Sequence, residues 1–178
     1  AQFGERASDK LLDRIDVEIA SRGVLDVLRK GVDDQGIKFY LAYFQSDSAF
    51  NAEMQSKYEA NILSVVRQLK YSAKNENSID TVLFLNGLPI FTVELKNAMT
   101  GQTVENAIKQ YKEDRDPREK LLSFKRVLVH FAVDTDLVYM TTKLDKLRTF
   151  FLPFNRGNDG GAGNELNPDG HKTAYLWE

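Results

Sequence analysis

Apolar residues recur along this chain with the periods of helices and strands. In residues 7–20 and 103–114 they return every three or four positions, which is the spacing of a helix with one buried face. Further helices are predicted over 22–30, ending near Gly31, and over 51–61. Runs of apolar, β-branched and aromatic residues predict strands at 38–44, 66–71, 80–85, 89–96, 126–133 and 137–142.

The order of these elements is helices, strand, helix, strands, helix, strands. Because helices and strands alternate, we predict an α/β fold in which a mixed β-sheet is flanked by helices. Asp134 and Asp136 lie between two predicted strands, and we favour a turn there over a second acid pair. The glycine-rich residues 155–170 predict a long irregular loop.

Composition restricts the class of protein. The chain has 178 residues, of which 42% are hydrophobic and 28% charged. It has no apolar run of the roughly 18 residues that a membrane-spanning helix needs. We therefore expect residues 1–178 to form a single soluble globular domain with no membrane partner. The absence of a starting Met and of a signal peptide suggests a fragment of a longer cytoplasmic protein.

Charge and residue usage exclude several kinds of site. There is no cysteine, so disulfides and thiolate metal sites are excluded, and the 2 histidines make a His-rich zinc site improbable. The net charge of −2 argues against a protein that coats nucleic acid. It is compatible with a nuclease, because a carboxylate metal site contributes negative charge and basic residues can be local.

Charged residues interrupt two of the most apolar predicted strands. Asp80 lies on the first, and Glu94 and Lys96 lie on the second. Charges on buried strands are uncommon unless they are paired or used. The two carboxylates and the Leu95 carbonyl are oxygen ligands that suit Mg²⁺, for which Mn²⁺ can substitute. A bound metal activates water, and Lys96 can orient that water or steady a charged phosphate. The other interpretation is an ion pair between Lys96 and one of the acids.

The register of this hairpin decides whether the two acids meet. A two-residue turn at Asn86-Gly87 would set Asp80 opposite Val93 and turn Glu94 to the other face. A three-residue loop over 85–87 with a left-handed Gly87, or a bulge near Asp80, brings the acids to one face. We therefore predict an odd-numbered loop or a bulge.

Several other residues have a functional and a structural interpretation. Glu59 is a candidate supplementary acid, although a surface role is favoured. His130 lies between apolar neighbours, so we predict a satisfied core or interface histidine. A run of basic residues is either a local phosphate-binding surface or a solvated stretch of mixed charge. These basic residues are Lys109, Lys112, Arg115, Arg118, Lys120, Lys125 and Arg126.

The spacing of Asp80 from Glu94-Leu95-Lys96 resembles the PD-(D/E)xK nuclease motif. The surrounding sequence resembles, over nearly the whole chain, the N-terminal nuclease domain of the R (restriction) subunit of type I restriction enzymes. The similar segments are residues 23–29, 58–61, 75–80, 83–89, 93–97 and 151–157, together with the glycine-rich loop.

This resemblance implies a restriction-endonuclease-like fold and a Mg²⁺-dependent endonuclease that acts on double-stranded DNA in a bacterial or archaeal cell. In the family, the domain precedes an ATP-driven motor, which we expect beyond residue 178, and it works with modification and specificity subunits. The chain contains no G-x-x-x-x-G-K-[ST] motif, so ATP binding is expected only of the full-length protein. We also expect the fragment alone to be weak or inactive.

The family's Gln-x-x-x-Tyr motif is only partly present. Tyr111 matches the tyrosine, but Ala107 stands where the glutamine is expected and Gln110 is the nearest glutamine. Tyr111 also continues an apolar helix face, so it is either a motif residue or a core residue. The incomplete motif leaves a second interpretation open, in which the domain is a catalytically silent module that binds DNA or partner subunits.

Overall fold

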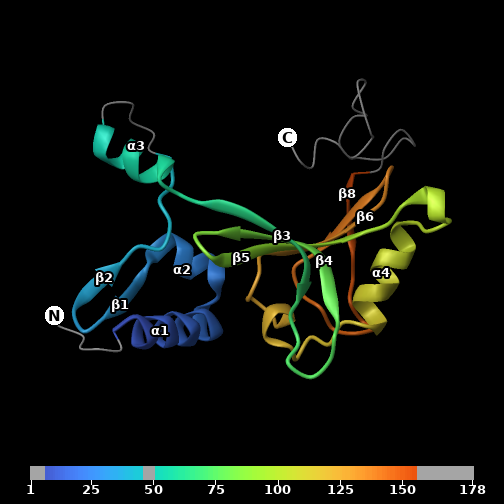
Figure 1. The fold of residues 1–178 in the computed structure, drawn as a ribbon, viewed down its shortest axis with the longest axis horizontal. Coiled ribbons are helices and arrows are strands. Elements are labelled where there is room, and N and C mark those ends of the chain that lie inside the picture. The colour runs from blue at the N-terminus through green and yellow to red at the C-terminus, as the bar shows by residue number, and fades with distance from the viewer. Residues whose placement is uncertain (1–6, 46–50, 156–178) are drawn as a thin grey trace.

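The computed structural model of the protein describes residues 7–45 and 51–155 (Figure 1). The helices are α1 (Ala7–Arg22), α2 (Val24–Lys30), α3 (Ala52–Glu59) and α4 (Val104–Glu113), with short 3₁₀ turns η1 (Ala98–Thr100) and η2 (Lys120–Leu122). The strands are β1 (Val32–Asp34), β2 (Ile37–Phe39), β3 (Leu63–Lys70), β4 (Ser78–Leu85), β5 (Leu88–Leu95), β6 (Val129–Val133), β7 (Val138–Thr141) and β8 (Leu152–Asn155).

The central feature is a six-stranded sheet in the order β3-β4-β5-β6-β7-β8. Strands β5 and β6 are parallel, and every other neighbouring pair in this sheet is antiparallel. Helix α4 lies in the connection between β5 and β6, which is the usual way to join parallel neighbours. The predicted α/β fold with a mixed sheet is confirmed.

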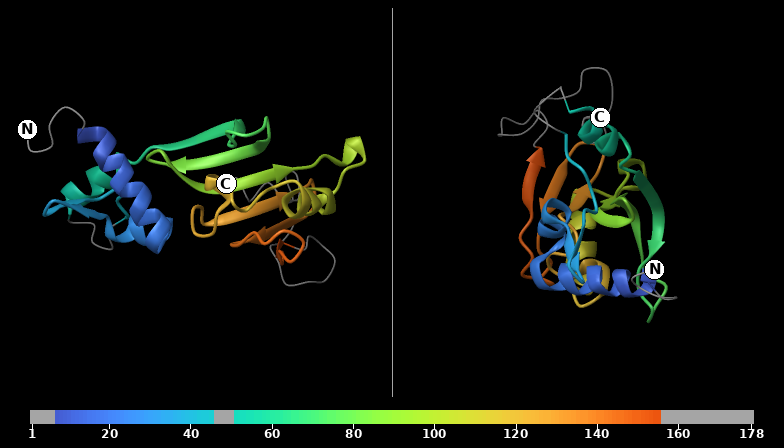
Figure 2. Two further views of the ribbon diagram at one scale, coloured as in Figure 1. Left: turned by 90° about the horizontal axis from the view of Figure 1, so that it is seen from below. Right: turned by 90° about the vertical axis from the view of Figure 1, so that its left-hand side faces the viewer.

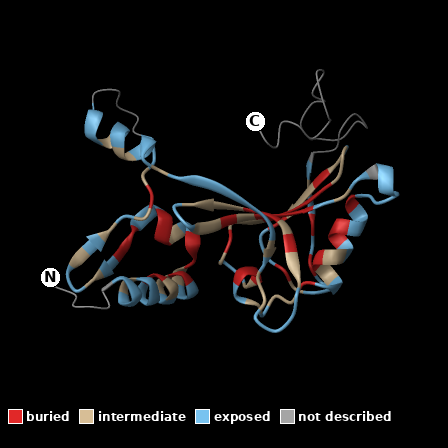
Figure 3. Ribbon diagram, in the orientation of Figure 1, coloured by how far each residue is buried: buried red, intermediate tan, exposed pale blue. Residues whose placement is uncertain are grey.

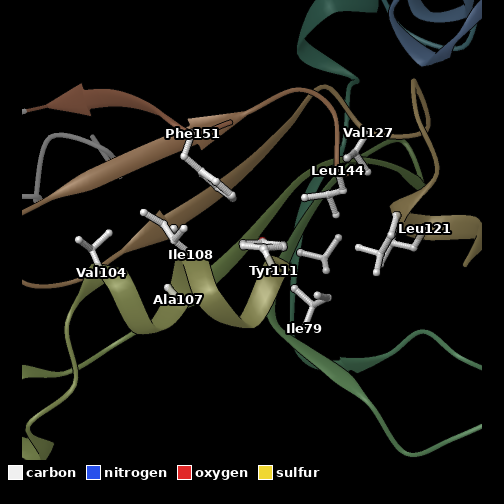
Figure 4. Close-up of a cluster of buried hydrophobic side chains, with 12 residues drawn as sticks. Ile79, Val104, Ala107, Ile108, Tyr111, Leu121, Val127, Leu144 and Phe151 are labelled. Atoms are coloured by element: carbon white, nitrogen blue, oxygen red, sulfur yellow. The ribbon is translucent and has the colours of Figure 1, made fainter. Parts of the chain in front are cut away.

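Helix α4 covers one face of this sheet (Figure 4). Its predicted apolar face is buried in full, namely Val104, Ala107, Ile108 and Tyr111. Thr103 and Asn106 form a capping box at its first turn, and the Asp134 carboxylate accepts the Val104 N–H at 2.8 Å. Asp134 also accepts the N–H groups of Asp136 and Leu137, so the predicted Asp-Thr-Asp turn is confirmed.

A second apolar cluster lies at the other end of the sheet, where α1, α2 and β1 pack (Figures 1 and 2). Its buried residues include Ile19, Val27 and Val32. The β4–β5 hairpin connects the two clusters, because Val82 belongs to the α4 cluster and Ile90 to the cluster with α1 and α2. The hairpin that carries the predicted site is therefore anchored at both ends.

The predicted strand at 38–44 is wrong beyond Phe39. Residues 32–39 form a short hairpin, β1–β2, whose turn is made by Gln35 and Gly36 at positive φ. After it, the backbone N–H and C=O of Tyr43 are bonded by the Asn61 side chain instead of a neighbouring strand. Strand β8 was not expected from the sequence, and most of the predicted 155–170 loop lies outside the described residues.

Helix α3 and strand β3 form the exposed side of the molecule (Figure 3). The predicted helix and strand are confirmed, but α3 has no buried residue and β3 is exposed along almost its whole length. Strand β3 is also an edge strand, so only β4 pairs with it.

Candidate functional site

The β4–β5 hairpin has a two-residue turn and a bulge. Asn86 and Gly87 both have positive φ, at 49° and 82°, which is the type I′ geometry favoured in tight hairpins. The predicted three-residue loop is therefore wrong. The predicted alternative, a bulge, is present: the register shifts between Leu83 and Phe84, so that Leu83 pairs with Phe91. It lies near the turn and not near Asp80.

This bulge sets the register of the hairpin so that Asp80 and Glu94 can lie on the same face. Beyond it, Thr81 pairs with Val93, and continuing this register sets Asp80 across from Glu94. Paired residues on adjacent strands point to the same face of a sheet. Asp80 and Glu94 therefore share a face, and an unbroken two-residue hairpin would have separated them.

Asp80 is held by two neighbours. Its Oδ2 accepts the backbone N–H of Leu95 at 2.9 Å, and its Oδ1 accepts the Gln68 side-chain amide at 2.9 Å. Gln68 in turn accepts the Ser78 hydroxyl at 2.9 Å. Leu95, the third predicted ligand, is thus placed by its backbone directly beside the Asp80 carboxylate.

Glu94 is fully buried and is bound to Arg115. Both Nε and Nη2 of Arg115 lie 2.7 Å from the same oxygen, Oε1. The other oxygen, Oε2, is buried and has no hydrogen-bond partner within the described part of the chain. Burial, opposed by Arg115 and reinforced by Asp80, raises the pKa of the Glu94 carboxyl to about 8.

Lys96 contacts the helix that follows it. Its ammonium donates to Gln110 Oε1 at 2.6 Å, so the predicted helix-motif glutamine reaches the predicted catalytic lysine. The expected alternative, an ion pair between Lys96 and one of the acids, does not form. Beside Lys96 opens a polar cleft of about 450 Å³, lined by Gln102, Asn106, Lys109, Gln110, Glu113 and Asp114.

Beneath the acids lies a buried chain of hydrogen bonds. The Thr92 hydroxyl is 2.9 Å from Tyr111 Oη and 2.7 Å from His130 Nδ1. Tyr111 is wholly buried in the α4 cluster (Figure 4), so it is a core residue that also fixes α4 against β5. His130 is the satisfied core histidine that the sequence predicts, and burial lowers its pKa to about 4.

Comparison with known proteins identifies the family of this chain. Residues 6–149 match the family described as the type I restriction enzyme R protein N terminus. The chain belongs to this family. A protein of Methanocaldococcus jannaschii, whose name describes a candidate type I restriction enzyme MjaVIIIP endonuclease subunit, is 26% identical over 181 residues. The match covers 99% of this chain but spans only 15% of the relative's length. No solved structure matches the chain.

Two sets of predicted residues do not join the site of this R-subunit domain. Glu59 is exposed on α3, where it accepts a hydrogen bond from Gln55, and α3 lies at a distance from the hairpin's acids (Figure 1). The basic run does not act as one surface. Arg115 is buried against Glu94, while Arg118 pairs with Asp116 and both Lys120 and Arg126 pair with Asp16.

The residues present fit a hard cation. No group of three or more His, Cys, Asp or Glu side chains gathers anywhere in residues 7–45 and 51–155. The hairpin nevertheless supplies two carboxylates on one face, and one of their oxygens is buried without a partner. An unpaired buried carboxylate oxygen is costly unless something binds it. Oxygen donors of this kind suit Mg²⁺ or Mn²⁺.

Two residues of the site were not singled out in the sequence. Gln68 lies twelve positions before Asp80, and only the pairing of β3 with β4 brings them together. Arg115 was grouped with the surface cations, because nothing in the sequence separates it from Arg118. The sequence holds one chemical clue to Arg115, which is that a buried glutamate needs a cation. Arg115 lies just past the end of α4, close enough to Glu94 to supply that cation.

Other features of the domain lie apart from these acids. A larger cavity, of about 710 Å³, lies between α2 and residues 124–128, and none of the hairpin's charged residues lines it. Among the described residues, no helix is both long and apolar enough to cross a membrane. The polar cleft beside Lys96 is lined by Lys96 itself, but by neither Asp80 nor Glu94.

Proposed function

We propose that this R-subunit domain is the DNA-cutting part of a type I restriction enzyme, and that it hydrolyses phosphodiesters with Asp80, Glu94 and Lys96. One observation carries the proposal. The hairpin bulge brings Asp80 and Glu94 to one face, with a buried, unpartnered Glu94 oxygen between the strands. Lys96 follows two positions later on the same strand.

Asp80, Glu94 and the Leu95 carbonyl would hold Mg²⁺, for which Mn²⁺ can substitute. When bound, the ion lowers the pKa of a water and offsets the charge that develops on the phosphate. Gln110 fixes the Lys96 ammonium by accepting one of its protons, at 2.6 Å. Lys96 therefore keeps two further N–H donors for the attacking water or a phosphate oxygen.

Gln110 supplies the glutamine of the partly matched Gln-x-x-x-Tyr motif in this proposal. It contacts Lys96, whereas Tyr111 stabilises the helix from within the core. The helix thus has a polar side that serves the site and an apolar side that holds it in place. The expected partners are double-stranded DNA, the ATP-driven motor of the same subunit, and the modification and specificity subunits.

The test separates DNA cutting from DNA translocation. In the assembled enzyme, Asp80→Asn, Glu94→Gln and Lys96→Ala are each expected to lower cleavage by at least about 10²-fold, as loss of a charge-stabilising group does. ATP-driven translocation, followed by displacement of a third DNA strand, should continue at the wild-type rate. The matched control is Asp33→Asn, an exposed acid on β1. Cleavage retained by any of the three variants contradicts the assignment of that residue.

One observation favours a second candidate, a nuclease-fold module that binds DNA or subunits without cutting. Glu94 already has a cation, because Arg115 is bound to it at 2.7 Å. In that case the acid and arginine form a structural ion pair. Wild-type complex that translocates DNA but never cuts it, and shows no Mn²⁺ bound at Asp80, would establish this alternative.

A further inference from the structure

Arg115 is built into the core beside the acids. It is only 5% exposed, and it follows directly after the last turn of α4. Its backbone N–H bonds to the Gln110 carbonyl at 3.2 Å, and its own carbonyl accepts the Lys146 ammonium at 3.2 Å. The guanidinium lies 5.9 Å from the centroid of the Tyr71 ring. These contacts come from separate parts of the chain and leave the side chain little freedom.

Arg115 binds only one of the two carboxylate oxygens of Glu94. Both Arg115 donors bind Glu94 Oε1, and neither reaches Oε2. An arginine that only neutralised the carboxylate would gain more from the two-oxygen fork, which is the stronger arrangement. The observed arrangement occupies Oε1 and leaves Oε2 without a hydrogen-bond donor, close to the Asp80 carboxyl, which helps to raise the pKa of Glu94. The free oxygen belongs to the residue that lies across from Asp80 in the hairpin register.

Charge also limits how many divalent ions the Glu94 carboxyl can bind. The Arg115 guanidinium stays charged at every accessible pH, so it is a permanent cation beside Glu94. Within the site, Arg115 is paired with Glu94 at 2.7 Å, and Lys96 is bonded to Gln110 at 2.6 Å. A second divalent ion would have to share Glu94 with the guanidinium, at strong repulsion in a buried position.

We infer that Arg115 is a positioning residue that occupies Oε1 of Glu94 and thereby restricts the site to a single divalent ion between Glu94 Oε2 and Asp80. This inference rests on the proposed function, because it concerns the metal of the same site. It adds what that proposal leaves open, namely the number of ions and the residue that sets it.

The first measurement counts the ions. Mn²⁺ is titrated into the wild-type chain, with free Mn²⁺ followed by electron paramagnetic resonance, and crystals soaked in Mn²⁺ give anomalous peaks. The expected result is one ion per chain, bound to Asp80 and Glu94 Oε2, with Arg115 still on Oε1. Two ions, or an ion on Oε1, would overturn the inference and leave the proposed function standing. No ion, with or without a short duplex, would overturn both.

The second measurement tests the role of Arg115 itself. Arg115→Gln removes the charge, Arg115→Lys keeps it without the fork, and Arg118→Gln is the matched control on an exposed arginine. Arg115→Gln is expected to weaken Mn²⁺ binding by about tenfold or more, the usual effect of losing a residue that orients a metal ligand. Arg115→Lys should recover part of that loss, and Arg118→Gln should bind like wild type.

A merely structural arginine would give a different pattern. Arg115→Gln would then lower the melting temperature while Mn²⁺ bound with unchanged affinity, and that result overturns the inference. Thermal melts of each variant show whether it is folded. Where Arg115→Gln does not fold, Arg115→Lys still decides, because a lysine variant that binds Mn²⁺ as tightly as wild type would overturn the role given to the guanidinium fork. The wild-type ion count does not depend on either variant.

Discussion

At the scale of single residues, Gln68 has a backbone conformation that an ordinary side chain avoids. Its φ is 49°, in the left-handed region, which costs a residue with a Cβ about 1–2 kcal/mol. The same residue joins Ser78 to the Asp80 carboxylate through its amide. A strained residue that holds a predicted metal ligand suggests that the strain is retained because it aims the amide at Asp80.

Two substitutions of Gln68 separate its strain from its contact. Gln68→Ala loses the amide and keeps the strain, whereas Gln68→Gly loses both. Both variants should bind Mn²⁺ more weakly than wild type, by about tenfold, because Asp80 loses an orienting partner. Gln68→Gly should unfold at higher urea than Gln68→Ala, by about 1 kcal/mol in free energy of unfolding. Equal stabilities would show that φ at this position carries no strain.

His130 should make the stability of the domain depend on pH. Burial lowers its pKa from 6.5 to about 4, so between these values the unfolded chain binds a proton that the folded protein excludes. The free energy of unfolding contributed by His130 is therefore fully present above pH 6.5 and falls as the pH drops through 4. A shift of this size corresponds to about 3 kcal/mol.

The variant His130→Asn isolates that contribution. Asparagine can still form a hydrogen bond with the Thr92 hydroxyl from the position of Nδ1, as either donor or acceptor, but it does not titrate. Urea unfolding at pH 7 and pH 4 should therefore show a smaller loss of stability in the variant than in wild type, by about 3 kcal/mol. Parallel losses in the two proteins would mean that other groups dominate the acid response.

At the scale of elements, a Gly→Ala substitution should lower the stability by different amounts at two glycines. Gly87 lies in the turn of the β4–β5 hairpin, and Gly31 lies in a closely packed position after α2. Gly87→Ala adds a Cβ that meets nothing within 4 Å, so its cost is the positive φ alone, about 1 kcal/mol. Gly31→Ala places a Cβ 2.4 Å from the Phe39 carbonyl oxygen. The overlap adds to the φ cost, for a total of roughly 3 kcal/mol. Urea unfolding of both variants measures the difference, and equal losses would contradict this account.

The elements also show what the sequence could and could not predict. The apolar face of α4 was correct because its period follows from helix geometry and the sheet covers the whole face. The strand predicted at 38–44 failed because the Asn61 and Asn86 side chains bond the backbone there, and their partners lie far along the chain. A local pattern cannot contain such contacts.

The residues of the candidate site also divide into those that the sequence predicted and those that only the structure shows. Asp80, Glu94 and Lys96 were named from the sequence, because charges on apolar strands are conspicuous, and Gln110 was named from the resemblance to the family's Gln-x-x-x-Tyr motif. The parity argument showed that a bulge or an odd loop was needed, but it did not place the bulge, whose extra residue, Ile90, is buried in the cluster with α1 and α2. Arg115 and Gln68 depend on tertiary contacts alone, so only the structure shows them.

At the scale of the whole molecule, one hairpin joins two apolar clusters and carries one set of acids. Asp80 and Glu94 lie on that hairpin, and no group of three or more His, Cys, Asp or Glu side chains that could hold a metal ion occurs in the described ranges 7–45 and 51–155. Strand β3, which lies beside the hairpin at the edge of the sheet, is exposed along almost its whole length (Figure 3). If the proposed function is correct, each chain brings a single cutting site to a duplex.

A single site has a consequence for the product. The two strands of a duplex run in opposite directions, so a site aligned on one phosphodiester is not aligned on its partner across the groove. Cutting both strands then requires a second copy or a rebinding step.

A plasmid assay with Mn²⁺ tests this consequence on the isolated chain, which we expect to be weak. The chain should convert a supercoiled plasmid to nicked circles well before linear DNA appears, at a rate proportional to protein concentration. Glu94→Gln, measured alongside, should leave the plasmid supercoiled. Linear DNA formed without a nicked intermediate would mean that two chains act together, and the rate would then rise with the square of the concentration.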